Sequence, residues 1–133
     1  MTQNPVARIL VVDDEEDVLT FIGTLLEDNG YSVIKAVNGK EGFAKAKAEL
    51  PDLILLDIYM PEESGVRMYR NVCDEPQTSH IPVIILTGIS HEFKHFIETR
   101  RQVPPPAGYF DKPPDRDQLL TKIKELLASK TTV

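Results

Sequence analysis

The stretch that most constrains this chain is a run of four aliphatic residues ending in one acid, Leu53-Ile54-Leu55-Leu56-Asp57. A short apolar run bounded by turn-forming residues is typical of a strand buried on both faces of a parallel sheet, and here Pro51 precedes the run and Pro61 follows it. Asp57 is therefore expected at the carboxyl end of a central strand, where open α/β sheets bind their ligands. The simpler role of a helix cap is less favoured, because Asp57 stands several residues before any plausible helix.

The rest of the chain alternates short apolar runs with stretches of helical period. Strands are predicted over residues 8–12, 31–37, 53–57, 82–87 and 109–111. Helices are predicted after Asp14 up to a stop at Gly30, and over residues 42–50, 66–73, 91–101 and 115–128, with a turn at Asn38-Gly39. Phe21 and Leu50 are among the apolar residues expected to face inward. This alternation predicts an α/β fold, a doubly wound five-stranded parallel sheet in three layers.

Size and charge exclude several classes of protein. The 133 residues suit one domain, which we expect over residues 8–128 with short tails at 1–7 and 129–133. A formal net charge of −6 argues against direct nucleic-acid binding, which needs clustered Lys and Arg. No apolar run approaches the length that would allow membrane insertion, and the N-terminus lacks a signal pattern. Together with the single cysteine, Cys73, this favours a cytoplasmic protein.

Polar residues stand at the ends of the predicted strands: Asp13-Asp14, Asp57, Thr87 and Lys112. In a parallel sheet these ends share one edge, so the side chains should converge. Two carboxylates about 4 Å apart repel by roughly 4 kcal/mol near a protein surface, so either a cation compensates the acids or one of them stays protonated. Lys112 supplies one positive charge, and Mg²⁺ suits a site of carboxylates and waters. Asp57 then becomes a candidate nucleophile toward a phosphoryl group, with Lys112 neutralising phosphoryl oxygens and Thr87 donating a hydrogen bond.

Four motifs stand on these strand ends in order: Asp13-Asp14, D-x-x-M-P-x-x-S-G over residues 57–65, I-P-V-I-I-L-T over residues 81–87, and Lys112-Pro113. Over about residues 8–128 the set resembles the response regulator receiver domain family, of the single-domain chemotaxis or sporulation type. The resemblance implies a flavodoxin-like (βα)5 sandwich with strand order 2-1-3-4-5. It also implies a two-component or phosphorelay signalling role, as a phosphoacceptor with self-catalysed transfer and autodephosphorylation rather than a turnover enzyme.

The resemblance also assigns roles to individual residues. Asp57 would accept phosphate from a histidine kinase or a histidine phosphotransfer protein, and Mg²⁺ would be held by Asp13, Asp14, Asp57 and the backbone carbonyl of Tyr59. Thr87 would be the switch hydroxyl, Lys112 the phosphate-binding lysine, and Tyr109 the aromatic switch residue that changes a surface for a downstream protein target. The Lys112-Pro113 bond would be cis. The chain resembles a stand-alone receiver or an excised fragment.

The chain departs from the family pattern before Tyr109. The run Pro105-Pro106-Ala107-Gly108 stands where the family usually has a Gly-Ala and an acidic pair, and the segment between Thr87 and Lys112 is a few residues longer than usual. The helix expected over residues 91–101 and its loop are therefore altered, and the family's usual dimer mode is not carried over.

Three other functions remain open. A phosphatase of the haloacid dehalogenase type also uses an aspartate at a strand end, but wants a second acid two residues later, where this chain has Tyr59. An interaction module that keeps the fold without phosphate chemistry would not need the acid, hydroxyl and lysine set. His91-Glu92-Phe93-Lys94-His95 matches the zinc-protease motif H-E-x-x-H, with Glu98 as the available third ligand, but a solvated helix surface is the simpler interpretation.

Overall fold

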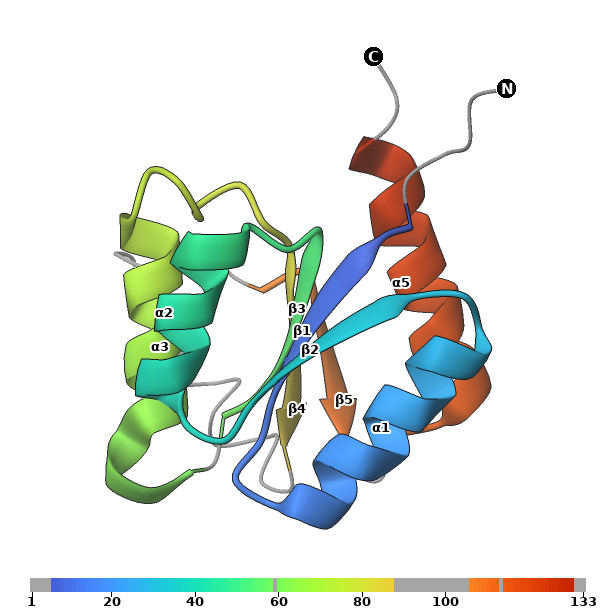
Figure 1. Ribbon diagram of the computed structural model, residues 1–133, viewed down its shortest axis with the longest axis horizontal. Coiled ribbons are helices and arrows are strands. Elements are labelled where there is room, and N and C mark those ends of the chain that lie inside the picture. Colours follow the sequence, from blue (N-terminus) through green and yellow to red (C-terminus); the bar gives the residue numbers. More distant parts are fainter. Residues whose placement is uncertain (1–5, 59, 88–105, 113, 131–133) are drawn as a thin grey trace.

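The computed structural model describes residues 6–58, 60–87, 106–112 and 114–130. Its sheet contains five parallel strands in the order β2-β1-β3-β4-β5 (Figure 1). The strands are β1 (Arg8–Val12), β2 (Ser32–Ala36), β3 (Leu53–Asp57), β4 (Val83–Thr87) and β5 (Gly108–Asp111). The predicted α/β class, the parallel sheet and the strand order are thereby confirmed.

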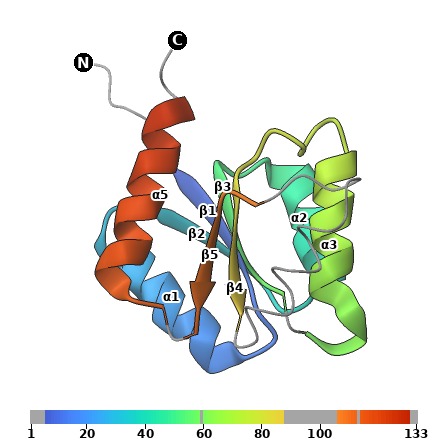
Figure 2. The same cartoon turned by 180° about the vertical axis from the view of Figure 1, so that it is seen from behind.

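Helices cover both faces of the sheet, so the domain has three layers. They are α1 (Glu16–Asp28), α2 (Gly39–Glu49), α3 (Ser64–Asp74) and α5 (Arg116–Lys130), and a 3-10 turn, η1 (Pro61–Glu63), precedes α3. The two views show α2 and α3 on one face and α1 and α5 on the other (Figures 1 and 2). The helix predicted over residues 91–101 lies outside the described residues. No helix in the described ranges is long and apolar enough to cross a membrane.

Alternating side chains of the central strands build two apolar cores. Leu10, Ile54 and Ile85 face the side of α2 and α3, and Val11, Leu55 and Ile84 face the side of α1 and α5. All six are at most 1% exposed. Each fully buried aliphatic side chain contributes about 1.5–3 kcal/mol. The polar residues at the strand ends therefore follow directly after the fully buried segments of the central strands.

Helix α1 follows the predicted pattern except at Phe21. The buried stripe consists of Leu19, Ile22 and Leu26, whereas Phe21 is 47% exposed. Phe21 faces away from the centre of that stripe on a helix of 3.6 residues per turn, so the prediction that it faces inward is wrong. The helix ends at Asp28, and Gly30 follows with φ +89°, a left-handed conformation that glycine adopts without strain.

Helix α2 begins earlier than the sequence predicts. Asn38-Gly39 does not form a separate turn, because Asn38 caps the helix and its Oδ1 accepts a hydrogen bond of 2.8 Å from the Glu41 amide. A Cβ at Gly39 would collide with the Ser64 carbonyl oxygen, so α2 and α3 pack closely here. Leu50, predicted to face inward, is 50% exposed and ends α2 in a left-handed conformation.

Candidate functional site

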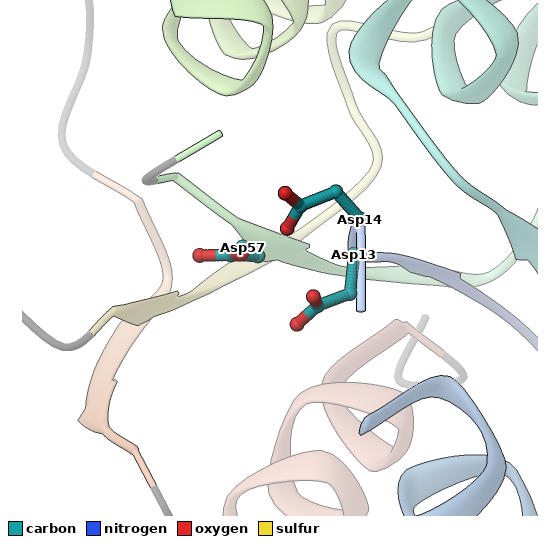
Figure 3. A group of neighbouring side chains, drawn as sticks. All are labelled: Asp13, Asp14 and Asp57. Atoms are coloured by element: carbon teal, nitrogen blue, oxygen red, sulfur yellow. The ribbon is translucent and has the colours of Figure 1, made fainter. Parts of the chain in front are cut away.

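The acids that follow β1 and β3 lie side by side at the carboxyl edge of the sheet. These strands are adjacent, and Val12 pairs with Leu56, which places Asp13 next to Asp57. Asp13 is 1% exposed and Asp57 is 2% exposed, whereas Asp14 is exposed. One carboxylate oxygen from each of the three residues lies within 4.8 Å of the other two, and Figure 3 shows the three side chains gathered at the strand ends.

Lys112 follows the carboxyl end of β5, and its side chain reaches this cluster although β4 separates β5 from β3. Its Nζ lies 2.6 Å from Oδ2 of Asp13 and 3.2 Å from Oδ2 of Asp57. Burial opposes protonation of Lys112, but hydrogen bonding and Coulombic attraction from Asp13 and Asp57 outweigh it and raise the pKa of Lys112 above its ordinary value. The ammonium therefore stays charged and offsets part of the repulsion between the two buried carboxylates.

A fourth carboxylate stands at the rim of this site. Oε1 of Glu15 lies 4.0 Å from Nζ of Lys112, and the Glu15 amide donates a 2.9 Å hydrogen bond to Oδ1 of Asp13. The sequence interpretation did not include Glu15 among the site residues. The available signal was its position in the acidic run that begins at Asp13, but that run does not show which acids face the lysine.

The donor set suits a hard divalent cation. Apart from its ion pair with the Lys112 ammonium, the buried Oδ2 of Asp13 has no hydrogen-bond donor among the described residues. Magnesium prefers carboxylate oxygens and keeps several waters, and Asp14 opens the cluster to solvent. An open recess of about 340 Å³ adjoins Asp14, lined also by Val37, Asn38, Lys40, Met60, Pro61, Glu62 and Ser64. Solvent and ligands can therefore reach the exposed side of the cluster.

Gly65 allows the chain after Asp57 to fold back under the strand end. A Cβ at this position would lie 2.6 Å from the carbonyl oxygens of Asp57 and Ile58. In the same loop Glu62 has a φ of +59°, and the Ser64 hydroxyl accepts a 3.2 Å hydrogen bond from the Gly39 amide. The close approach at Gly65 fixes the path of the segment that follows Asp57.

Tyr109 lies on β5, with its side chain packed against the core cluster shared with α3. The side chain is partly buried and its hydroxyl oxygen is buried, so in this conformation Tyr109 is turned inward. On α3, burial together with Cys73 and Tyr109 raises the pKa of Tyr69 well above its ordinary value, and the Tyr69 hydroxyl therefore stays protonated. The proposed switch residue thus adjoins a buried polar group on α3.

Several predicted site residues are only partly described. The backbone of Thr87 ends β4 and pairs with Asp111, while its side chain falls outside the described part of the chain. Tyr59 and Pro113 lie outside the described residues, and so do the predicted carbonyl ligand and the predicted cis bond. The H-E-x-x-H segment beginning at His91 also lies outside them.

Comparisons with known proteins agree with this arrangement. The response regulator receiver domain family matches residues 9–124. Protein PilH of Pseudomonas aeruginosa is 38% identical over 122 residues, which cover 92% of this chain and 98% of PilH. The alkaline phosphatase synthesis transcriptional regulatory protein PhoP of Bacillus subtilis is 41% identical over 86 residues, covering 65% of this chain but 35% of PhoP.

Solved structures show the same relationship. The crystal structure of a CheY-like response regulator receiver domain protein from Methanospirillum hungatei is similar with a TM-score of 0.82 at 32% identity, covering 94% of this chain and 96% of that one. The family match spans nearly the whole domain, and the acidic cluster and Lys112 lie at the carboxyl edge of its sheet. The chain therefore belongs to the response regulator receiver domain family of two-component signalling.

Proposed function

We propose that Asp57 accepts a phosphoryl group from the phosphohistidine of a histidine kinase or a histidine phosphotransfer protein, and that this changes a protein-binding surface. Receiver domains are phosphoacceptor signalling modules and not turnover enzymes. The observation that carries the proposal is the position of Asp57, buried at a central strand end with a lysine ammonium 3.2 Å from its Oδ2.

The transfer needs a nucleophile and compensation of charge. A carboxylate oxygen of Asp57 attacks phosphorus, forming a P–O bond while the P–N bond of phosphohistidine breaks and the imidazole retains the bonding electron pair. Lys112 holds positive charge 3.2 Å from Oδ2 of Asp57, so it can neutralise a phosphoryl oxygen without leaving the site. The hydroxyl of Thr87, which ends the neighbouring strand β4, would donate a hydrogen bond to another phosphoryl oxygen.

The acidic cluster is of the kind that holds Mg²⁺ in receiver domains. Asp13, Asp14, Asp57 and the carbonyl of Tyr59 would hold the ion, and it would neutralise charge on the phosphoryl oxygens. Asp13 makes two contacts in this scheme, since its Oδ2 faces Lys112 and its Oδ1 accepts a hydrogen bond from the Glu15 amide. This second contact fixes the orientation of the carboxylate before any cation binds.

Phosphorylation would act on a two-state element formed by Thr87 and Tyr109. The hydroxyl of Thr87 is drawn toward the phosphoryl group, and this stabilises the inward conformation of Tyr109 over an outward one. The inward conformation is the one seen here, with the Tyr109 hydroxyl buried beside the core shared with α3. The surface around β4, β5 and α5 would then favour one downstream protein partner.

Intact-mass measurement with acetyl phosphate and Mg²⁺ tests the proposal. The wild type should gain one labile phosphate, and Asp57→Asn should gain none while keeping its fold. Asp28→Asn is the matched control, because Asp28 is an exposed acid at the far end of α1 and should not affect labelling. Continuous turnover of the donor would support a phosphatase instead, and labelling of Asp57→Asn at the wild-type level would refute the assignment.

A further inference from the structure

Glu15 occupies a helix-capping position without using its side chain as a cap. It is the N-cap residue of α1, with extended backbone (φ −97°, ψ 116°) and no capping hydrogen bond from its side chain. Ser, Thr, Asp and Asn are preferred at this position because their short side chains reach the free amides of the first turn. The choice of glutamate at position 15 is therefore not explained by capping.

The Glu15 side chain instead faces the ammonium of the phosphate-binding lysine. Its Oε1 lies 4.0 Å from Nζ of Lys112, and the side chain is 66% exposed. The two other carboxylates on this ammonium are buried, with side-chain exposures of 1% for Asp13 and 3% for Asp57. Glu15 thus lies on the solvent side of Lys112, and the buried acids lie on the protein side.

This placement puts a negative charge beside the route into the site. Asp57 is buried among neighbouring strands, so a phosphodonor must approach from the exposed side, where Asp14 and Glu15 stand. A donor with a strongly anionic phosphoryl group is repelled by Glu15, and the repulsion is moderate because water and salt screen an exposed charge. A donor with a positive charge next to its phosphoryl group is repelled less.

We propose that Glu15 is a specificity-determining residue that disfavours free anionic phosphodonors relative to donors with a cationic group beside the phosphoryl group. The inference rests on the proposed function, since it concerns the choice of donor for Asp57. A phosphohistidine presented from a basic protein surface has the favoured chemistry, whereas a free acyl phosphate does not.

Two small donors separate this effect from general reactivity. Acetyl phosphate loses acetate as its P–O bond breaks, and phosphoramidate loses ammonia as its P–N bond breaks, each giving the same P–O bond to Asp57. Phosphoramidate carries less net negative charge near neutral pH because its nitrogen is protonated. Initial rates of phosphate gain are followed by intact mass with Mg²⁺, a suitable readout for a chain that contains no tryptophan.

Glu15→Gln should raise the acetyl phosphate rate up to about tenfold, the effect of removing one unit charge at roughly 6 Å from a dianion in a water-like dielectric. The phosphoramidate rate should rise less, so the ratio of the two rates increases, and 1 M salt should abolish the change. Glu15→Lys should shift the ratio further in the same direction. Glu15→Asp, which retains the charge, should restore a ratio close to that of the wild type.

Glu16→Gln is the matched control. Glu16 is exposed, carries the same charge one residue later, and forms no ion pair within the described ranges. An unchanged donor ratio in Glu15→Gln, an equal rise with both donors, or an equal shift in Glu16→Gln would overturn the role of Glu15. A wild type that gains phosphate from neither donor would instead overturn the proposed function itself.

Discussion

The ammonium nitrogen of Lys112 lies 2.6 Å from Oδ2 of Asp13, although their strands are not neighbours in the sheet. The same nitrogen lies 3.2 Å from Oδ2 of Asp57, so one lysine is shared by two buried carboxylates. An ammonium held in this way stabilises the two buried carboxylates and is in place to contact a phosphoryl oxygen. The two roles make separate predictions for stability and for phosphotransfer.

Replacing Lys112 should weaken both the fold and the chemistry. Lys112→Met leaves Asp13 and Asp57 buried without the ammonium, and loss of one partner from a buried ion pair costs on the order of 3 kcal/mol. Urea unfolding with EDTA present should show this loss, while the exposed Lys124→Met should change stability little. Adding Asp57→Asn to Lys112→Met should recover part of the stability, because it removes one of the uncompensated charges. Independent, additive effects of the two substitutions would contradict the coupling.

Magnesium should stabilise the folded domain through the acidic cluster. For a dissociation constant on the order of 1 mM, 10 mM Mg²⁺ adds about 1.4 kcal/mol by mass action. Asp14→Asn should reduce this gain, since Asp14 is the exposed member of the cluster. The measurement is the thermal unfolding midpoint with and without Mg²⁺, with the exposed Asp74→Asn on α3 as the control. A wild-type midpoint indifferent to Mg²⁺ would count against the metal site.

Gly65 should be required for the geometry of the loop after Asp57. Gly65→Ala places a Cβ 2.6 Å from two carbonyl oxygens, so the backbone must shift, at a cost of about 1–3 kcal/mol. Gly30→Ala is a useful comparison, because it meets no neighbour within 4 Å but has a φ of +89°. Both variants should lower the urea midpoint, and only Gly65→Ala should also slow phosphate gain. Equal labelling rates in the two variants would show that the loop is not coupled to the site.

Phosphorylation of Asp57 should change the conformation around Tyr109, with Thr87 linking the two residues. With Mg²⁺ and beryllofluoride as a phosphate mimic, amide chemical shifts or hydrogen exchange should change at β4, β5 and Tyr109 as well as around Asp57. Thr87→Ala should still gain phosphate but give a weaker response at Tyr109, because the hydroxyl contact that biases the switch is lost. Changes confined to the surroundings of Asp57 in the wild type would refute the switch.

Much of the fold could be predicted because local patterns and tertiary burial agree. The apolar runs at residues 8–12, 53–57 and 82–87 have the composition typical of strands that are buried on both faces. Each one forms a central strand of the sheet. Their carboxyl ends share one edge, so the meeting of Asp13, Asp14 and Asp57 also followed from the sequence. The prediction for Phe21 is wrong because helical spacing shows which residues share an apolar stripe of the helix, but not how much of that stripe the sheet covers.

The order of residues along the chain was enough to predict which side chains stand at the strand ends, and it indicates the chemistry that those side chains can perform. Three features depend on the packing of the whole sheet: Lys112 reaches past β4 and β3 to Asp13, the Tyr109 hydroxyl is buried, and Glu15 faces the lysine from the solvent side. Local patterns specify the period and direction of each element, since they arise from neighbouring residues. Distances between side chains on different strands depend instead on sheet order, twist and packing, which all the elements set together.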